Sequence, residues 1–95
     1  MKGANIMSKL ITIAQALRDK GLTVTLDTID NEVTVLDRNF SILISEELGQ
    51  FSATLFTGDY LNAWASEEEL FTYRNPNAVV SAVAKRVKLI ESFSE

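Results

Sequence analysis

The hydrophobic positions of the chain follow a helical period at both ends and a period of two in between. From residue 6 to residue 17, apolar side chains recur at the spacings that form one stripe of an α-helix. Gly21 supplies a natural end for this helix, because glycine readily adopts the left-handed conformation found there. We therefore predict a helix over Ile6 to Lys20, preceded by a loose extension of residues 1–5. The apolar stripe consists of Ile6, Met7, Leu10, Ile11, Ile13, Ala14 and Leu17.

From Leu22 onward apolar and polar residues alternate, as a half-buried β-strand requires. Polar turns at residues 30–32 and 37–39, and a longer loop at residues 46–50, divide this region into four short strands that end before Gly58. Short links between consecutive strands predict an antiparallel meander. The residues that alternation assigns to its inward face are Val24, Leu26, Val33, Val35, Phe40, Ile42, Ile44, Phe51, Ala53 and Leu55.

The segment between Gly58 and Asn75 is the least regular part of the chain. Residues 60–65 fit a short edge strand, which would be the fifth, or a loop. Ser66 followed three residues later by Glu69 has the form of a capping box, in which each side chain accepts a hydrogen bond from a backbone N–H at a helix start. We therefore predict a short helix from Glu67 to about Tyr73.

Asn75 followed by Pro76 is the clearest helix start in the sequence, because proline costs no hydrogen bond at the first helical position. An apolar stripe then predicts a long helix to Ser92. The chain is thus expected to form one two-layer α+β domain over residues 1–95, with its helices packed on one face of the sheet. The stripe consists of Val79, Val80, Val83, Val87, Ile90 and Phe93.

The composition argues against catalysis. The chain contains neither histidine, the commonest general base, nor cysteine, the most nucleophilic side chain. Its four glycines are isolated, so no phosphate-binding loop is present. We expect no catalytic residues and no cofactor. No apolar run is long enough to cross a bilayer and no signal peptide is apparent, so we expect a cytoplasmic protein without membrane attachment.

Charge is unevenly distributed along the chain. Residues 21–69 hold ten acidic residues and one basic residue, whereas residues 1–20 and 70–95 are each net basic. Acidic residues favour turns and helix starts for local reasons, so this region has a merely solubilising interpretation. The alternative is that it attracts a basic protein by long-range electrostatics. The candidate partner-binding residues are then Asp27, Asp30, Glu32, Asp37, Glu46, Glu47, Glu67, Glu68 and Glu69, with the neighbouring aromatic residues Tyr60 and Trp64.

Asp27, Asp30 and Glu32 are also close enough in sequence to suggest a hard cation. However, no glycine provides the sharp turn of an EF-hand loop, and the spacing does not match that loop. We predict no metal site.

The outward face of the predicted sheet is rich in hydroxyl groups with an apolar minority. If both terminal helices cover the opposite face, Leu36, Leu43 and Phe56 form an exposed apolar stripe. This stripe is a candidate interface, and the alternative is an ordinary solvated sheet with scattered apolar residues. Tyr60, Trp64, Phe71 and Tyr73 form an aromatic cluster that is suited either to close one end of the core or to anchor a partner.

Three functions are compatible with these features. The leading hypothesis is a small acidic protein-binding module, an inhibitor or adaptor of the kind common among phage and mobile elements, that acts on a basic nucleic-acid-handling protein. The second is a homo-oligomeric structural protein that assembles through the open sheet face or an edge strand. The third is weak nucleic-acid binding through Lys85, Arg86 and Lys88, which the net charge of −4 disfavours.

Overall fold

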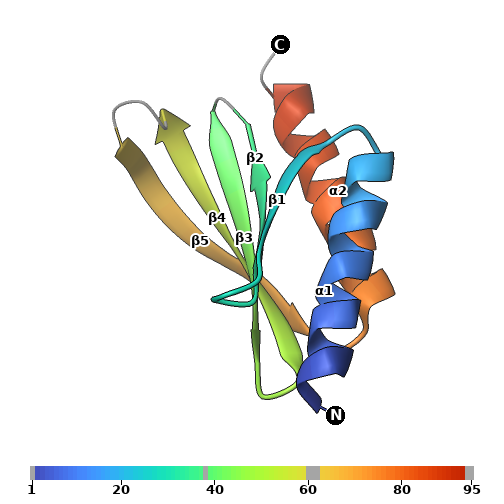
Figure 1. The fold of residues 1–95 in the computed structure, drawn as a ribbon. Helices are drawn as coiled ribbons and strands as arrows, with labels where there is room; N and C mark the ends of the chain where they lie inside the picture. The colour runs from blue at the N-terminus through green and yellow to red at the C-terminus, as the bar shows by residue number, and fades with distance from the viewer. Residues whose placement is uncertain (1, 38, 60–62, 94–95) are drawn as a thin grey trace.

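The computed structural model describes residues 2–37, 39–59 and 63–93, and it describes side chains for residues 7–37, 39–58 and 66–92. Five strands form one sheet in the order β1-β2-β3-β4-β5, and each is antiparallel to its neighbour (Figure 1). The predicted meander is therefore confirmed in outline, with a full fifth strand. The elements are α1 (Lys2–Asp19), β1 (Thr23–Asp27), β2 (Glu32–Leu36), β3 (Phe40–Glu47), β4 (Gln50–Asp59), β5 (Ala63–Tyr73) and α2 (Pro76–Phe93).

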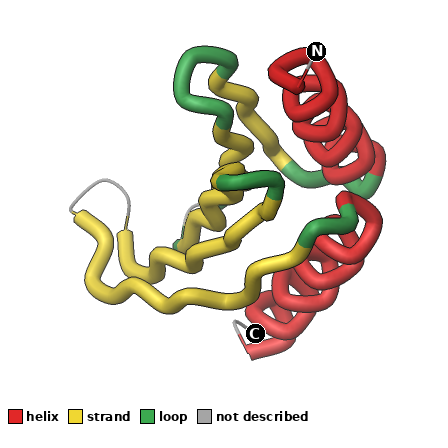
Figure 2. The backbone as a smooth tube through the Cα atoms, turned by 90° about the horizontal axis from the view of Figure 1, so that it is seen from below, coloured by secondary structure: helices red, strands yellow, loops and turns green. Residues whose placement is uncertain are grey.

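Both helices lie on the same side of the sheet, and they run side by side in the same direction (Figure 1). The sheet curves, so that β1 contacts α1 and the end of β5 lies beside α2 (Figure 2). Neither helix in the described part of the chain combines the length and the apolar character needed to cross a membrane.

The core lies between the helices and the inner face of the sheet. All inward strand positions predicted by alternation are buried there except Leu26, which is half-buried. Removing each large apolar side chain from water contributes about 1.5–3 kcal/mol to stability. Ile11 is 50% exposed, so its predicted place on the buried stripe of α1 is wrong. The buried helical residues are Leu10, Ile13, Ala14 and Leu17 of α1 and Val79, Val80, Val83 and Val87 of α2.

The end of α1 is fixed by local hydrogen bonds. Gly21, at φ 88°, donates its N–H to Arg18 O at 2.9 Å, and Leu22 donates to Leu17 O at 3.3 Å. This pair of bonds is the Schellman motif. The start of α1 differs from the prediction, because residues 2–5 are helical rather than a loose extension. No proline interrupts the backbone there, so the helix continues toward the N-terminus beyond the predicted first residue, Ile6.

The start of α2 is as predicted. The side-chain Oδ1 of Asn75 accepts a hydrogen bond from the N–H of Asn77 at 2.8 Å, and Asn75 O accepts one from Val79 at 3.2 Å. Pro76 occupies the first helical position, where its missing N–H removes no bond.

The predicted short helix at Glu67–Tyr73 is wrong, because these residues belong to β5. β4 extends over ten residues, and without β5 its second edge would lack backbone partners. That tertiary requirement outweighs the local capping signal: Ser66 pairs with Thr57 across the ladder instead of capping a helix. An extra residue, Leu70, forms a bulge between Glu69 and Phe71.

The predicted loop at residues 46–50 is also wrong. Glu47 pairs with Gln50, so only Leu48 and Gly49 connect β3 to β4. Both residues have positive φ, 54° and 78°, which is the geometry of a type I′ turn. The carboxylate of Glu46 accepts a hydrogen bond from the N–H of Gly49 at 2.8 Å, so this acidic residue stabilises the turn.

Candidate functional site

The outer face of the sheet is turned away from both helices (Figures 1 and 2). The strand register aligns its side chains in three rows that cross all five strands. The first row is Thr23, Leu36, Ser41, Phe56 and Glu67; the second is Thr25, Thr34, Leu43, Thr54 and Glu69; the third is Asp27, Glu32, Ser45, Ser52 and Thr72.

The three predicted apolar interface residues are brought together on this face. Ser41 lies directly between Leu36 and Phe56, and it is only 5% exposed. Leu43 follows two residues later on β3, in the adjacent row. Leu36 is 41% exposed, while Leu43 and Phe56 are half-buried. We call Leu36, Ser41, Leu43 and Phe56 the central patch.

Hydroxyl groups and carboxylates make up most of the rest of the described strand positions on the outer face, and Arg74, which follows β5, lines a hollow at one end of this face. Among the strand residues with described side chains, the outward positions carry Asp27, Glu32, Glu47, Glu67 and Glu69. The sequences of the five strands contain no lysine or arginine. We call these five acidic residues the acidic rim. The basic residues within the described ranges lie on the helices or in the links between elements.

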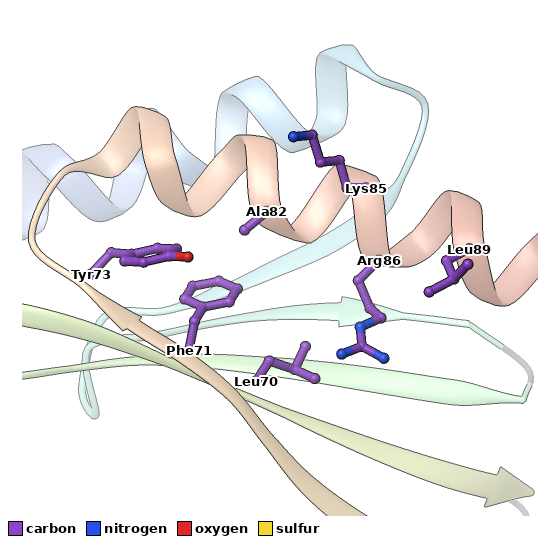
Figure 3. A pocket seen from close by; sticks show the side chains of 7 residues that line it. All are labelled: Leu70, Phe71, Tyr73, Ala82, Lys85, Arg86 and Leu89. Carbon is purple, nitrogen blue, oxygen red and sulfur yellow. The ribbon is translucent and has the colours of Figure 1, made fainter.

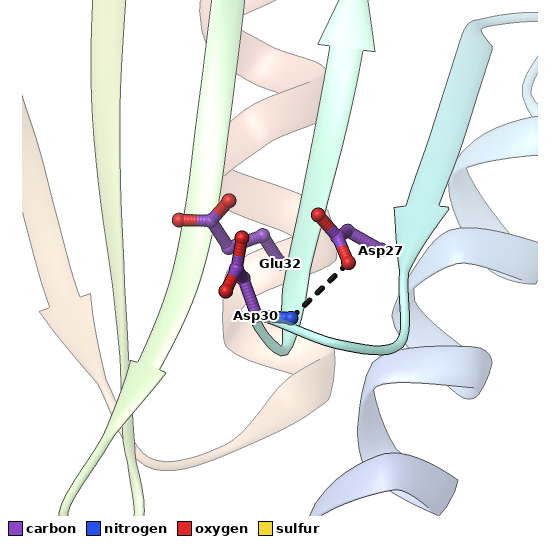
Figure 4. Close-up of side chains that lie close together, drawn as sticks. All are labelled: Asp27, Asp30 and Glu32. Atoms are coloured by element: carbon purple, nitrogen blue, oxygen red, sulfur yellow. Dashed lines mark hydrogen bonds between the residues drawn. The ribbon is translucent and has the colours of Figure 1, made fainter.

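Asp27, Asp30 and Glu32 form a close group at the link between β1 and β2, with carboxylate oxygens that lie within 4.8 Å of one another (Figure 4). Oδ1 of Asp27 accepts hydrogen bonds from the N–H groups of Ile29, at 2.8 Å, and Asp30, at 3.1 Å. These two hydrogen bonds explain the presence of Asp27 at this position, because they stabilise the turn. Carboxylates suit hard cations, but exposed acidic turns are common without one, and we assign no metal here.

Other predicted binding residues are placed elsewhere. Asp37 follows β2 at the end opposite Glu32, and its Oδ1 accepts a hydrogen bond from Asn39 N–H at 3.1 Å. Glu46 and Glu68 pair with inward-facing residues of β4, so they lie on the helix side of the sheet. Tyr60 lies outside the described residues, and so does the side chain of Trp64, although its backbone pairs with Gly58.

A groove between β5 and α2 was not predicted from the sequence. It encloses about 300 Å³, and its lining includes Leu70, Phe71 and Tyr73 of β5 with Lys85, Arg86 and Leu89 of α2 (Figure 3). The rings of Phe71 and Tyr73 are stacked, with centroids 4.7 Å apart. Phe71 packs against the core, as the core-closing interpretation expects, whereas Tyr73 is 43% exposed. The alternation of Phe71, Thr72 and Tyr73 was the available signal for a strand beside this groove.

Comparisons with protein-family models, with curated proteins and with solved structures found no match.

Proposed function

We propose that the chain is a small, non-catalytic protein-binding module that docks a basic protein onto its outer sheet face, and so serves as an inhibitor or adaptor of that partner. The observation that carries this proposal is the central patch, an apolar cluster on the face turned away from the helices, flanked within the described strands by hydroxyl groups and carboxylates. Interfaces commonly combine such an apolar centre with a polar border.

Each part of the face has a distinct role in the proposed complex. Covering Leu36, Leu43 and Phe56 removes apolar area from water, which is favourable by about 25 cal/mol per Å². The surrounding serine and threonine hydroxyls can both donate and accept hydrogen bonds. The acidic rim raises the rate of encounter with a basic surface and disfavours acidic partners.

The negative charge of this face also distinguishes between three kinds of partner: a second copy of the chain, a nucleic acid and a basic protein. In a face-to-face dimer the acidic rims of two copies would lie against one another, which is unfavourable. A nucleic acid would be repelled for the same reason. On the helix side, Arg86 already forms an ion pair with Glu68, at 3.2 Å, so the basic cluster around it is partly neutralised. A basic protein is therefore the partner that we propose.

The test passes a cell lysate over three immobilised proteins: the unmodified chain, the Leu43→Asp variant and the Ile11→Asp variant. It compares which proteins each of them retains. Ile11 is a matched control because it is an exposed apolar residue on α1, 50% exposed and remote from the outer face. A protein retained by the chain and by the control is identified and purified, and its affinity for all three is measured. We expect Leu43→Asp to weaken binding about tenfold or more, equivalent to about 1.4 kcal/mol.

Salt and oligomeric state complete the test. Affinity for the purified partner should fall as ionic strength rises, since added salt screens charges on an exposed rim. The chain alone should be monomeric by light scattering coupled to size-exclusion chromatography. Equal affinity of the chain and Leu43→Asp for the purified partner would overturn the proposal, as would a dimer that Leu43→Asp dissociates.

A further inference from the structure

The two edge strands of the sheet differ in how far they are covered. At β1, the guanidinium of Arg18 donates to the carbonyl oxygen of Val24 at 3.3 and 3.1 Å, and α1 packs against the strand. At β5, the described backbone makes its ladder with β4 and no backbone hydrogen bond to any other segment. The outer edge of β5 therefore presents backbone groups that are available for pairing.

The groove between β5 and α2 lies on the inner side of this open edge (Figure 3). Leu89, 48% exposed, and Tyr73, 43% exposed, lie on its two walls, and Leu70 and Phe71 add apolar surface between them. A strand added beside β5 would direct every second side chain toward this groove, because side chains alternate between the two faces of a sheet. Those side chains would have to be apolar to bury the exposed surface.

The other side of the added strand would meet carboxylates. Glu67 and Glu69 lie on the outer face, and neither forms an ion pair with any residue whose side chain is described. Glu68, which lies on the inner side, forms an ion pair with Arg86 at 3.2 Å. Cross-strand pairs of opposite charge are favourable, so the outward residues of an added strand should be basic.

These observations point to one occupant. We infer that the open edge of β5 and the groove beside α2 bind an extended peptide segment in which basic and apolar residues alternate. The backbone of the segment pairs with β5, its apolar side chains enter the groove, and its basic side chains meet Glu67 and Glu69. Pairing between two copies of β5 is disfavoured, because it would bring two glutamate runs together. The inference shares Glu67 and Glu69 with the outer-face proposal, but it does not need the central patch, since the peptide pairs with the edge of β5 and fills the groove on its inner side.

The experiment uses a labelled synthetic peptide in which lysine and valine alternate, with both ends blocked, titrated with the full chain by fluorescence polarisation. A peptide of the same composition with its lysines and valines in two separate blocks tests for alternation. A peptide of alternating glutamate and valine tests for charge. We expect both control peptides to bind about tenfold more weakly or worse, a difference of about 1.4 kcal/mol.

Two further peptides test for edge pairing itself. In an extended strand the N–H groups of alternate residues point to opposite edges, so N-methylation of every lysine blocks one edge and N-methylation of every valine blocks the other. Pairing with β5 through one edge predicts that one of these peptides binds and the other does not. Equal binding of both, or binding of neither, would overturn the inference.

Variants of the chain locate the site. Leu89→Asp places a charge on the α2 wall of the groove at an exposed position, and we expect it to weaken binding of the lysine–valine peptide about tenfold. Ile11→Asp is the matched control on α1 and should bind as the unmodified chain does. If no peptide binds, or if both variants bind equally, the glutamate run serves only to protect an exposed edge and the inference is wrong.

Discussion

The guanidinium of Arg86 on α2 lies 3.2 Å from the carboxylate of Glu68 on β5. This ion pair links β5 to α2 through Arg86, which lines the groove between them, and the two elements make few other contacts. Glu67, the preceding residue, points to the opposite face of the sheet and has no such partner among the described side chains. Two adjacent glutamates thus differ in their environment because side chains alternate along the strand.

This difference predicts unequal effects of neutralising the two residues. Glu68→Gln should lower the free energy of unfolding by about 0.5 kcal/mol, within the range expected of a partly exposed pair. Glu67→Gln, the matched control, should leave stability unchanged or raise it slightly. Urea denaturation at low and high salt measures both. Equal losses for the two variants, or a Glu68→Gln loss that salt does not reduce, would contradict the ion pair.

The register of β5 predicts which engineered cysteines can form a disulfide. Ser52 and Thr72 are directly opposite one another, with their hydroxyl oxygens 3.3 Å apart. The chain has no cysteine of its own, so thiol titration after mild oxidation reads the engineered pair alone. We expect Ser52→Cys with Thr72→Cys to lose both thiols intramolecularly, because such a separation is compatible with disulfide geometry.

The control for this pairing is Ser52→Cys with Ser66→Cys. Ser66 pairs with Thr57, several residues further along β4, so its sulfur is out of reach of position 52. A control pair that oxidises as readily as the first would show that residues 66–73 do not hold this register.

The turn between β3 and β4 predicts a stabilising substitution. Leu48 adopts φ 54°, a conformation that asparagine tolerates much better than leucine, and it is 93% exposed. Leu48→Asn should raise the free energy of unfolding by about 0.5–1 kcal/mol. Thermal and urea denaturation check this, and a loss of stability would argue against the type I′ turn.

Gly49 provides the complementary test of the same turn. A Cβ at this position would meet no atom within 4 Å, so any cost of Gly49→Ala comes from its φ of 78° rather than from a clash. We expect a loss of about 1 kcal/mol in the same denaturation experiments.

The features predicted correctly from the sequence depend on residues close together in the chain. Asn75 caps α2 through a bond to Asn77, and Gly21 ends α1 through a bond to Arg18. The same holds for the outer face, because strict alternation along each strand places Leu43 outward whatever the strand order is.

Two of the missed features, the fifth strand and the groove beside it, depend on contacts between distant segments. Ser66 and Glu69 satisfy a local helix signal, yet they form part of a strand because the edge of β4 needs backbone partners. The groove beside Arg86 could not be predicted for a related reason: its walls come from β5 and α2, whose relative placement follows only once the fifth strand is known. A local propensity of a few tenths of a kcal/mol per residue cannot outweigh an unpaired ten-residue strand edge.

The hydrogen bonds from Arg18 to Val24 O give a last prediction, which concerns the covered edge. Arg18→Ala removes a charged donor from a partly buried carbonyl of the edge strand β1, and we expect the free energy of unfolding to fall by about 1–1.5 kcal/mol. Lys20→Ala is the control: it removes a positive charge two residues along the chain, without removing a bond to β1. If Arg18 also protects this edge, the variant should self-associate at high concentration, as measured by light scattering, because the β1 edge then presents backbone groups without the glutamate run that disfavours pairing at β5. An Arg18→Ala protein as stable and as monomeric as Lys20→Ala would show that α1 alone covers β1.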